Sequence, residues 1–161
     1  MNRTLLTFLP AALLLGACST FGGAKKEVAP TYAGPAVEGV VLRPIADSAL
    51  PKGTCGMVLW TLDEERPAPI FRYVAGQQGE VAIDGAPVAL TRVEVEGDSA
   101  FGIFEEQTFI TEDGLKLNVK VKFSLGFDGG TYLERGLVSV ETPSGWRTVL
   151  PAAGLAGCRS K

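Results

Sequence analysis

Apolar and polar residues alternate without interruption from position 115 to position 125. This period of two predicts a β-strand with one buried face and one solvated face. Eight further stretches carry a strand signal: 40–43, 57–62, 70–75, 80–83, 88–96, 101–111, 132–141 and 146–150. No stretch from Gly39 onward shows a convincing helical period, so the pattern predicts an all-β domain.

Residues typical of turns separate these stretches. Asp84-Gly85 and Asp113-Gly114 favour the two-residue turns of β-hairpins, and glycine-containing turns are expected at 76–79, 128–130 and 143–145. The intervals leave no room for crossover helices, so sequential strands must pair antiparallel. We therefore expect an antiparallel meander of about eight strands, folded as a small barrel or a sandwich.

One acidic residue interrupts the expected inner face. A two-residue turn at Asp113-Gly114 would place Glu106 opposite Val121, among apolar side chains. A β-bulge could return Glu106 to water, the barrel mouth could be wet there, or Glu106 could be a functional inward carboxylate. On the outer face, the same register places Gln107 opposite Lys120.

Four side chains are candidate contacts for a ligand or a partner: Glu106, Trp60, Phe104 and Ser99. The two aromatic residues could line a pocket, although such residues also fill β cores. An enzymatic interpretation would need Glu106 with Glu134, or a Ser-Lys pair around Ser124. We regard this interpretation as weaker because no catalytic motif supports it.

Composition excludes several classes of site. The chain has no histidine, which removes Ser-His-Asp triads, Cys-His dyads and HExxH zinc sites. We find no phosphate-binding loop, dinucleotide fingerprint or EF-hand, and we predict no cofactor and no metal site. A net charge of −3 with no basic block beyond Lys25-Lys26 disfavours a nucleic-acid partner.

The first residues have the pattern of an export signal. One positive charge at Arg3 precedes an apolar stretch at 5–15, which is too short to span a membrane. Leu15-Gly16-Ala17-Cys18 then resembles the lipobox of bacterial lipoproteins at all four positions. This resemblance implies a signal peptide at 1–17, lipid on Cys18, and a membrane anchor. Ser19, in place of Asp, implies the periplasmic face of the outer membrane.

The position of the lipobox also sets the expected boundaries of the segments that follow it. Residues 18–37 are expected to form the lipidated terminus and a flexible tether, and 38–161 a periplasmic β domain. Removal of 1–17 takes away Arg3 and no acidic residue, so the net charge becomes −4. With Cys18 acylated in an oxidising compartment, Cys55 and Cys158 are expected to form a disulfide, the alternative being two buried thiols.

A second resemblance concerns the β domain. The stretch Val81-Ala82-Ile83-Asp84-Gly85 through Leu90-Thr91-Arg92-Val93 resembles a strand-turn-strand of the membrane-bound inhibitors of c-type lysozyme. The resemblance implies a small barrel and a loop that enters the lysozyme cleft. The corresponding stretch, 96–102, lacks the Tyr of the family motif and has its Ser and Gly in a different order.

These features favour a non-enzymatic, lipid-anchored binding module. Its partner would be a periplasmic or envelope protein, with the module acting as an envelope accessory or as an inhibitor of a hydrolase such as lysozyme. The alternative is a carrier that holds a small molecule or a lipid in a barrel lumen.

Overall fold

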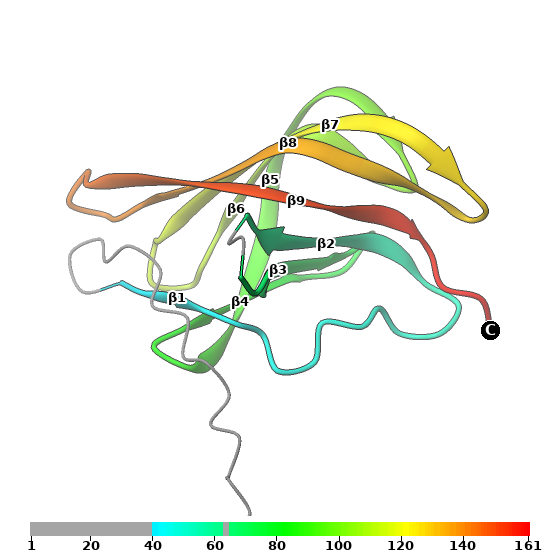
Figure 1. The fold of residues 1–161 in the computed structure, drawn as a ribbon. Coiled ribbons are helices and arrows are strands. Elements are labelled where there is room, and N and C mark those ends of the chain that lie inside the picture. The colour runs from blue at the N-terminus through cyan, green and yellow to red at the C-terminus, as the bar shows by residue number, and fades with distance from the viewer. Residues whose placement is uncertain (1–39, 63–64) are drawn as a thin grey trace, which may run out of the picture. The chain divides into compact units, whose positions relative to one another are not determined.

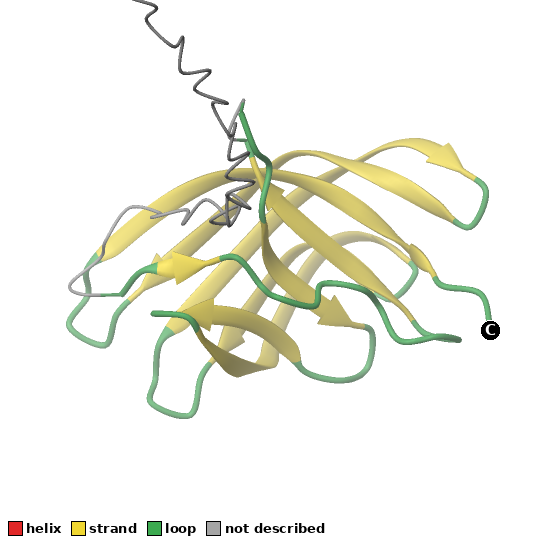
Figure 2. Ribbon diagram, turned by 60° about the horizontal axis from the view of Figure 1, so that its bottom comes forward, coloured by secondary structure: helices red, strands yellow, loops and turns green. Residues whose placement is uncertain are grey.

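The computed structural model describes residues 40–62 and 65–161, which form an eight-stranded antiparallel barrel with one additional strand (Figure 1). The strands are β1 (Leu42–Arg43), β2 (Cys55–Thr61), β3 (Pro69–Val74), β4 (Gly79–Ile83), β5 (Ala86–Ala100), β6 (Ile103–Ile110), β7 (Lys116–Phe127), β8 (Gly130–Glu141) and β9 (Arg147–Cys158). Figure 2 shows these residues as strands and loops only, so the predicted all-β class is confirmed.

The predictions for residues 1–37 concern a part of the chain that the structure does not describe. The signal peptide at 1–17, Cys18 and the tether at 18–37 lie outside the described residues. Within residues 40–62 and 65–161, no helix is long and apolar enough to span a membrane.

The barrel is a meander that closes on itself. Each strand from β2 to β9 pairs antiparallel with its neighbour in sequence, and β9 returns to pair with β2. The extra strand β1 pairs with the end of β4 through Leu42 and Ile83, beyond the short β3–β4 ladder. Of the two predicted architectures, the chain therefore adopts the barrel, in which closure removes exposed strand edges.

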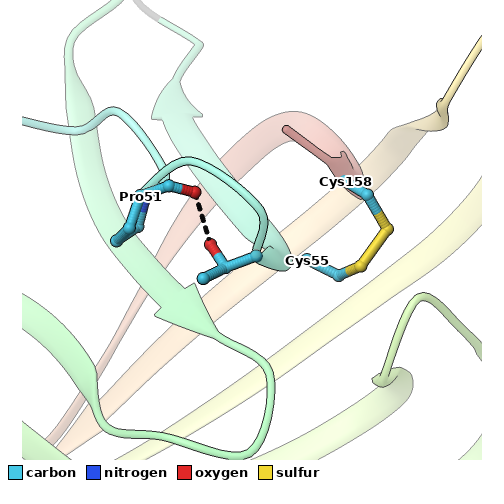
Figure 3. Close-up of a disulfide and its surroundings, with 4 residues drawn as sticks. Pro51, Cys55 and Cys158 are labelled. Atoms are coloured by element: carbon cyan, nitrogen blue, oxygen red, sulfur yellow. Dashed lines mark hydrogen bonds between the residues drawn. A yellow bond between two sulfur atoms is a disulfide. The ribbon is translucent and has the colours of Figure 1, made fainter. Parts of the chain in front are cut away.

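A disulfide joins the first and last barrel strands. Cys55 at the start of β2 lies opposite Cys158 at the end of β9, and their Cα atoms are 3.9 Å apart (Figure 3). The predicted Cys55–Cys158 bond is thereby confirmed. Next to it, Thr54 donates its hydroxyl to the carbonyl oxygen of Pro51, as drawn in the same figure.

Strand β9 is longer than the sequence pattern predicted. Ala and Gly, which are depleted in strands, dominate its second half. Small residues are needed here because β2 approaches closely. A Cβ atom at Gly154 would lie 2.1 Å from the carbonyl oxygen of Val58.

Large apolar side chains pack into one cluster in the barrel. Completely buried members include Met57, Leu59, Ile70, Phe71, Tyr73, Phe109, Leu117 and Val138. The ring of Phe109 packs edge-on against Phe71 and Tyr73, at centroid distances of 5.1 and 5.2 Å. This packing removes apolar surface from water and stabilises the barrel.

The β6–β7 hairpin corrects the predicted register. Thr111 pairs with Leu115 around a three-residue loop, in which the Gly114 N–H donates to the carbonyl oxygen of Thr111. Gly114 has a φ of +86°, as expected for a type I turn that ends in a left-handed residue. The two-residue turn predicted at Asp113-Gly114 is therefore wrong, and every pair shifts by one residue.

Candidate functional site

The register shift moves Glu106 to the outside of the barrel. Glu106 lies opposite Lys120, and its carboxylate accepts from the Lys120 ammonium at 2.8 Å and from the Asn118 amide at 3.1 Å. The hydrogen bond from Lys120 lowers the pKa of Glu106, partial burial opposes this effect, and Asn118 adds to it. The structure thus shows an outward ion pair in place of an inward carboxylate.

The two-residue turn also predicted that Glu105 would lie opposite Lys122 on the outer face, and this contact is present. Lys122 lies 3.7 Å from Glu105, as an outer Glu-Lys ladder requires. Gln107, predicted to face outward toward Lys120, is instead completely buried.

Gln107 is the polar side chain that enters the core. Its carbonyl oxygen accepts from the Arg92 guanidinium at 2.8 Å, and its amide lies 4.0 Å from the sulfur of Met57. The Arg92 guanidinium also packs over Tyr73 and Phe104, at 4.9 and 5.5 Å from the ring centroids. This arrangement satisfies a buried amide with a cation that aromatic rings stabilise.

Phe104 and Ser99 lie beside each other and apart from the Glu106 carboxylate network. Ser99 at the end of β5 pairs with Phe104 at the start of β6, and Ser99 is exposed. The ring of Phe104 packs against the Arg92 guanidinium, so its observed contact is within the protein.

Trp60 belongs to a different surface, on the outer wall of β2 and β9. It lies opposite Ala153, and the next outward pair along β2 and β9 is Val58 with Leu155. Trp60, Val58 and Leu155 line, together with Phe127, a solvent-open groove with a volume of about 300 Å³. We call this surface the aromatic groove and define it by Leu50, Val58, Trp60, Phe127, Leu155 and Gly157.

A row of glycines lies beneath the side chains that border this groove. Gly56, Gly157 and Gly130 occupy adjacent positions on β2, β9 and β8, and Phe127 continues the row on β7. A Cβ atom at Gly130 would lie 2.5 Å from Cζ of Phe127, so the Phe127 ring can lie over β8 only because Gly130 has no side chain.

Phe127 forms one wall of the groove and Leu50 forms the opposite wall. Like Phe127, Leu50 lies over a glycine. A Cβ atom at Gly56 would lie 2.8 Å from Cδ2 of Leu50, so glycine is required beneath that side chain as well. Hydrogen bonds from Arg72 to the Ala49 carbonyl oxygen and from Arg159 to the Leu50 carbonyl oxygen hold this segment on the barrel. Gly157 lines the groove, and a Cβ atom there would lie 2.5 Å from the carbonyl oxygen of Gly129.

The groove is apolar and partly exposed. Leu155 is 36% exposed and Phe127 is 43% exposed. Tyr132, which pairs with Leu155, is 50% exposed and extends the apolar surface by contacting the Phe127 ring at 5.1 Å. A clustered apolar surface of this kind marks interaction sites more often than scattered exposed residues do.

Sequence reasoning identified Trp60 but missed Phe127, Leu155 and the glycine row. Gly56, Gly157 and Gly130 are far apart in sequence, and only the strand register brings them together. The available signal was the pairing of Cys55 with Cys158. Extending that ladder by one residue places Gly56 opposite Gly157.

The residues considered for catalysis do not form one cleft with Glu106. Glu134 is exposed and lies opposite Lys122, whereas Glu106 lies opposite Lys120. The carbonyl oxygen of Ser124 accepts from the Thr131 hydroxyl. In residues 40–62 and 65–161, no three His, Cys, Asp or Glu side chains are placed to hold a metal ion.

Comparison with known proteins gives no relative from which to transfer a function: no family model, no curated protein and no solved structure matches the chain. The geometry of the site must therefore carry any functional proposal.

Proposed function

We propose that this protein is a lipid-anchored lipoprotein of the bacterial outer membrane, and that its barrel is a non-enzymatic binding module for an envelope protein. The lipobox Leu15-Gly16-Ala17-Cys18 and the preceding apolar stretch support the anchor. Several acyl chains on Cys18 would hold the protein on the membrane, since a single chain anchors only weakly.

The aromatic groove is the observation that carries the binding function. It offers concave apolar surface on the outer wall, with Trp60 and Phe127 as aromatic contacts. Aromatic residues in such depressions commonly contribute much of the energy of protein association. The inner face of the barrel, in contrast, is occupied by packed side chains such as Met57, Phe71 and Phe109, which favours external binding over a carrier function.

An envelope accessory fits the structure better than a lysozyme inhibitor. The inhibitor interpretation relied on a protruding loop, either 97–102 or 63–69, and the family resemblance points to the first. Residues 96–100 belong to β5, and only Phe101 and Gly102 form the following turn. This segment therefore offers little projecting chain for insertion into a cleft.

The test is retention of an envelope protein on the full immobilised chain. Leu155→Gln makes part of the apolar lining of the groove polar, and Val95→Gln changes a comparably exposed residue on β5. We expect the wild type and Val95→Gln to retain the same protein, and Leu155→Gln to lose it. Equal retention by all three would contradict binding at the groove.

Two further measurements test the anchor and the inhibitor interpretation. We expect Cys18→Ser to abolish acyl labelling and membrane fractionation, because Cys18 is the proposed lipid attachment site. We expect c-type lysozyme to remain fully active with excess protein. Membrane retention of Cys18→Ser would contradict the anchor, and inhibition of lysozyme would restore the inhibitor function.

A further inference from the structure

Three cationic residues lie near one end of the aromatic groove. Arg159 lines the groove, and its carbonyl oxygen accepts from the N–H of Gly53, beside Lys52. The side chain of Lys161 also lies next to Gly53, since a Cβ atom at Gly53 would be 3.4 Å from Cγ of Lys161. We call Lys52, Arg159 and Lys161 the basic corner.

No ion pair of the described residues neutralises the basic corner. None of the ion pairs among the described residues involves Lys52, Arg159 or Lys161, and all three are exposed. Asp128 is the acidic residue in the lining of the groove. Three cations without an ion-pair partner and one aspartate therefore flank the apolar depression, so positive charge is in excess there although the net charge of the chain is −3.

We infer that the groove binds an acidic polypeptide segment, with an apolar side chain in the depression and carboxylates at the basic corner. The inference rests on the proposed function and names the chemistry of the partner. Opposite charges at the rim of an apolar contact would steer association and add modest affinity.

The shape of the groove favours a polypeptide over a lipid bilayer. A volume of about 300 Å³ lies in the range of small ligand pockets and suits one or two apolar side chains. A bilayer surface would be met by a protruding amphipathic face, not by a depression between two walls. The walls here are Leu50 and Phe127, held above Gly56 and Gly130.

The fluorescence of Trp60 can be used to measure binding in the groove. The chain contains two tryptophans, and Trp146→Phe removes the one that lies in the exposed β8–β9 turn. In this background of the full chain, the fluorescence of Trp60 reports occupancy of the groove. The probe is a synthetic peptide of alternating Glu and Leu residues. Two matched peptides replace every Glu by Lys, or every Leu by Ser.

We expect the Glu-Leu peptide to shift Trp60 emission saturably, and both matched peptides to bind at least tenfold more weakly. Lys52→Gln combined with Lys161→Gln should weaken the Glu-Leu peptide about three- to tenfold, since each exposed ion pair contributes little. The control Lys116→Gln with Lys122→Gln removes equal charge from β7 and should change binding less than twofold. Raising the salt concentration should weaken binding.

The outcomes separate the two proposals. Equal binding of the Lys-Leu peptide, or no effect of the Lys52 and Lys161 changes, would overturn the acidic partner while leaving the groove as a site. A Trp60 shift with anionic phospholipid vesicles but not with the peptide would overturn the polypeptide in favour of a membrane. Loss of envelope-protein retention in Leu155→Gln is measured separately and decides the proposed function.

Discussion

Glu106 shows how one side chain's role depends on the strand register. The sequence predicted an inward carboxylate because the hairpin turn was assigned two residues. With three residues in the loop, Glu106 faces Lys120 on the outer wall and Gln107 enters the core. An inward carboxylate would have needed a raised pKa or a cationic partner, whereas a buried neutral amide needs only hydrogen bonds such as that from Arg92.

The ion pair of Glu106 predicts a pH dependence of stability. Its pKa is lower in the folded protein than its ordinary value of 4.5, so its stabilising contribution is present above pH 4.5 and is lost as the pH falls through the folded pKa. Glu106→Gln should cost about 0.5 kcal/mol at pH 7 and less at pH 3. Urea unfolding at both pH values measures this, with Glu112→Gln as a turn control. An equal cost at both pH values would contradict the assignment.

The close contact between Gly130 and the Phe127 ring predicts the effect of a substitution at Gly130. Gly130→Ala places a methyl group within 2.5 Å of the Phe127 ring, so the ring must move and the wall of the groove is lost. We expect a loss of about 1–3 kcal/mol in the free energy of unfolding, as for other overpacking changes. Thermal unfolding measures this change.

Gly126→Ala is the matched control for Gly130→Ala, because a Cβ atom at Gly126 meets nothing closer than 3.7 Å. Equal stability of the two variants would contradict the proposed packing of Phe127 over β8.

The strands were predictable wherever side chains alternate and turns carry glycine. β7 and β8 follow the expected pattern because each has one apolar and one polar face. The second half of β9 was missed because Ala and Gly dominate it, and their presence reflects close contact with β2. Local sequence does not encode such long-range contacts.

Substitution of Gly114 tests the conformation of the β6–β7 turn. Gly114 has a φ of +86°, a conformation that costs residues with a side chain roughly 1–2 kcal/mol. Gly114→Ala should destabilise the barrel by about 1 kcal/mol, and Gly114→Asn by less, because Asn tolerates this conformation. Chemical denaturation of both variants checks the order. Equal stability of Ala and Asn variants would contradict a left-handed residue at this position.

Closure of the barrel depends on the contact between β2 and β9, and the disulfide lies at the end of that contact. Cys55 and Cys158 are 103 residues apart in sequence. The pairing was predictable from the cysteine count and the expected export, whereas the groove beside it was not. The groove requires Gly56, Gly157 and Gly130 in one row, which follows only from the strand register.

The disulfide should contribute strongly to stability. In the chain-entropy model, a loop of about 100 residues corresponds to roughly 4.7 kcal/mol. Replacing both Cys55 and Cys158 by Ala should lower the free energy of unfolding by about 4–5 kcal/mol, as measured by urea unfolding. Reductant should destabilise the wild type similarly and leave the double variant unchanged. A double variant as stable as the oxidised wild type would contradict this role.

Site-specific crosslinking tests the central claim, that the outer groove and not the barrel interior binds the partner. A photoreactive amino acid would replace Leu155 in the groove, Val95 on β5, or buried Val138 inside the barrel, each in the full chain in living cells. We predict one protein adduct from position 155 and none from positions 95 and 138. An adduct from position 138, or none from position 155, would contradict the claim.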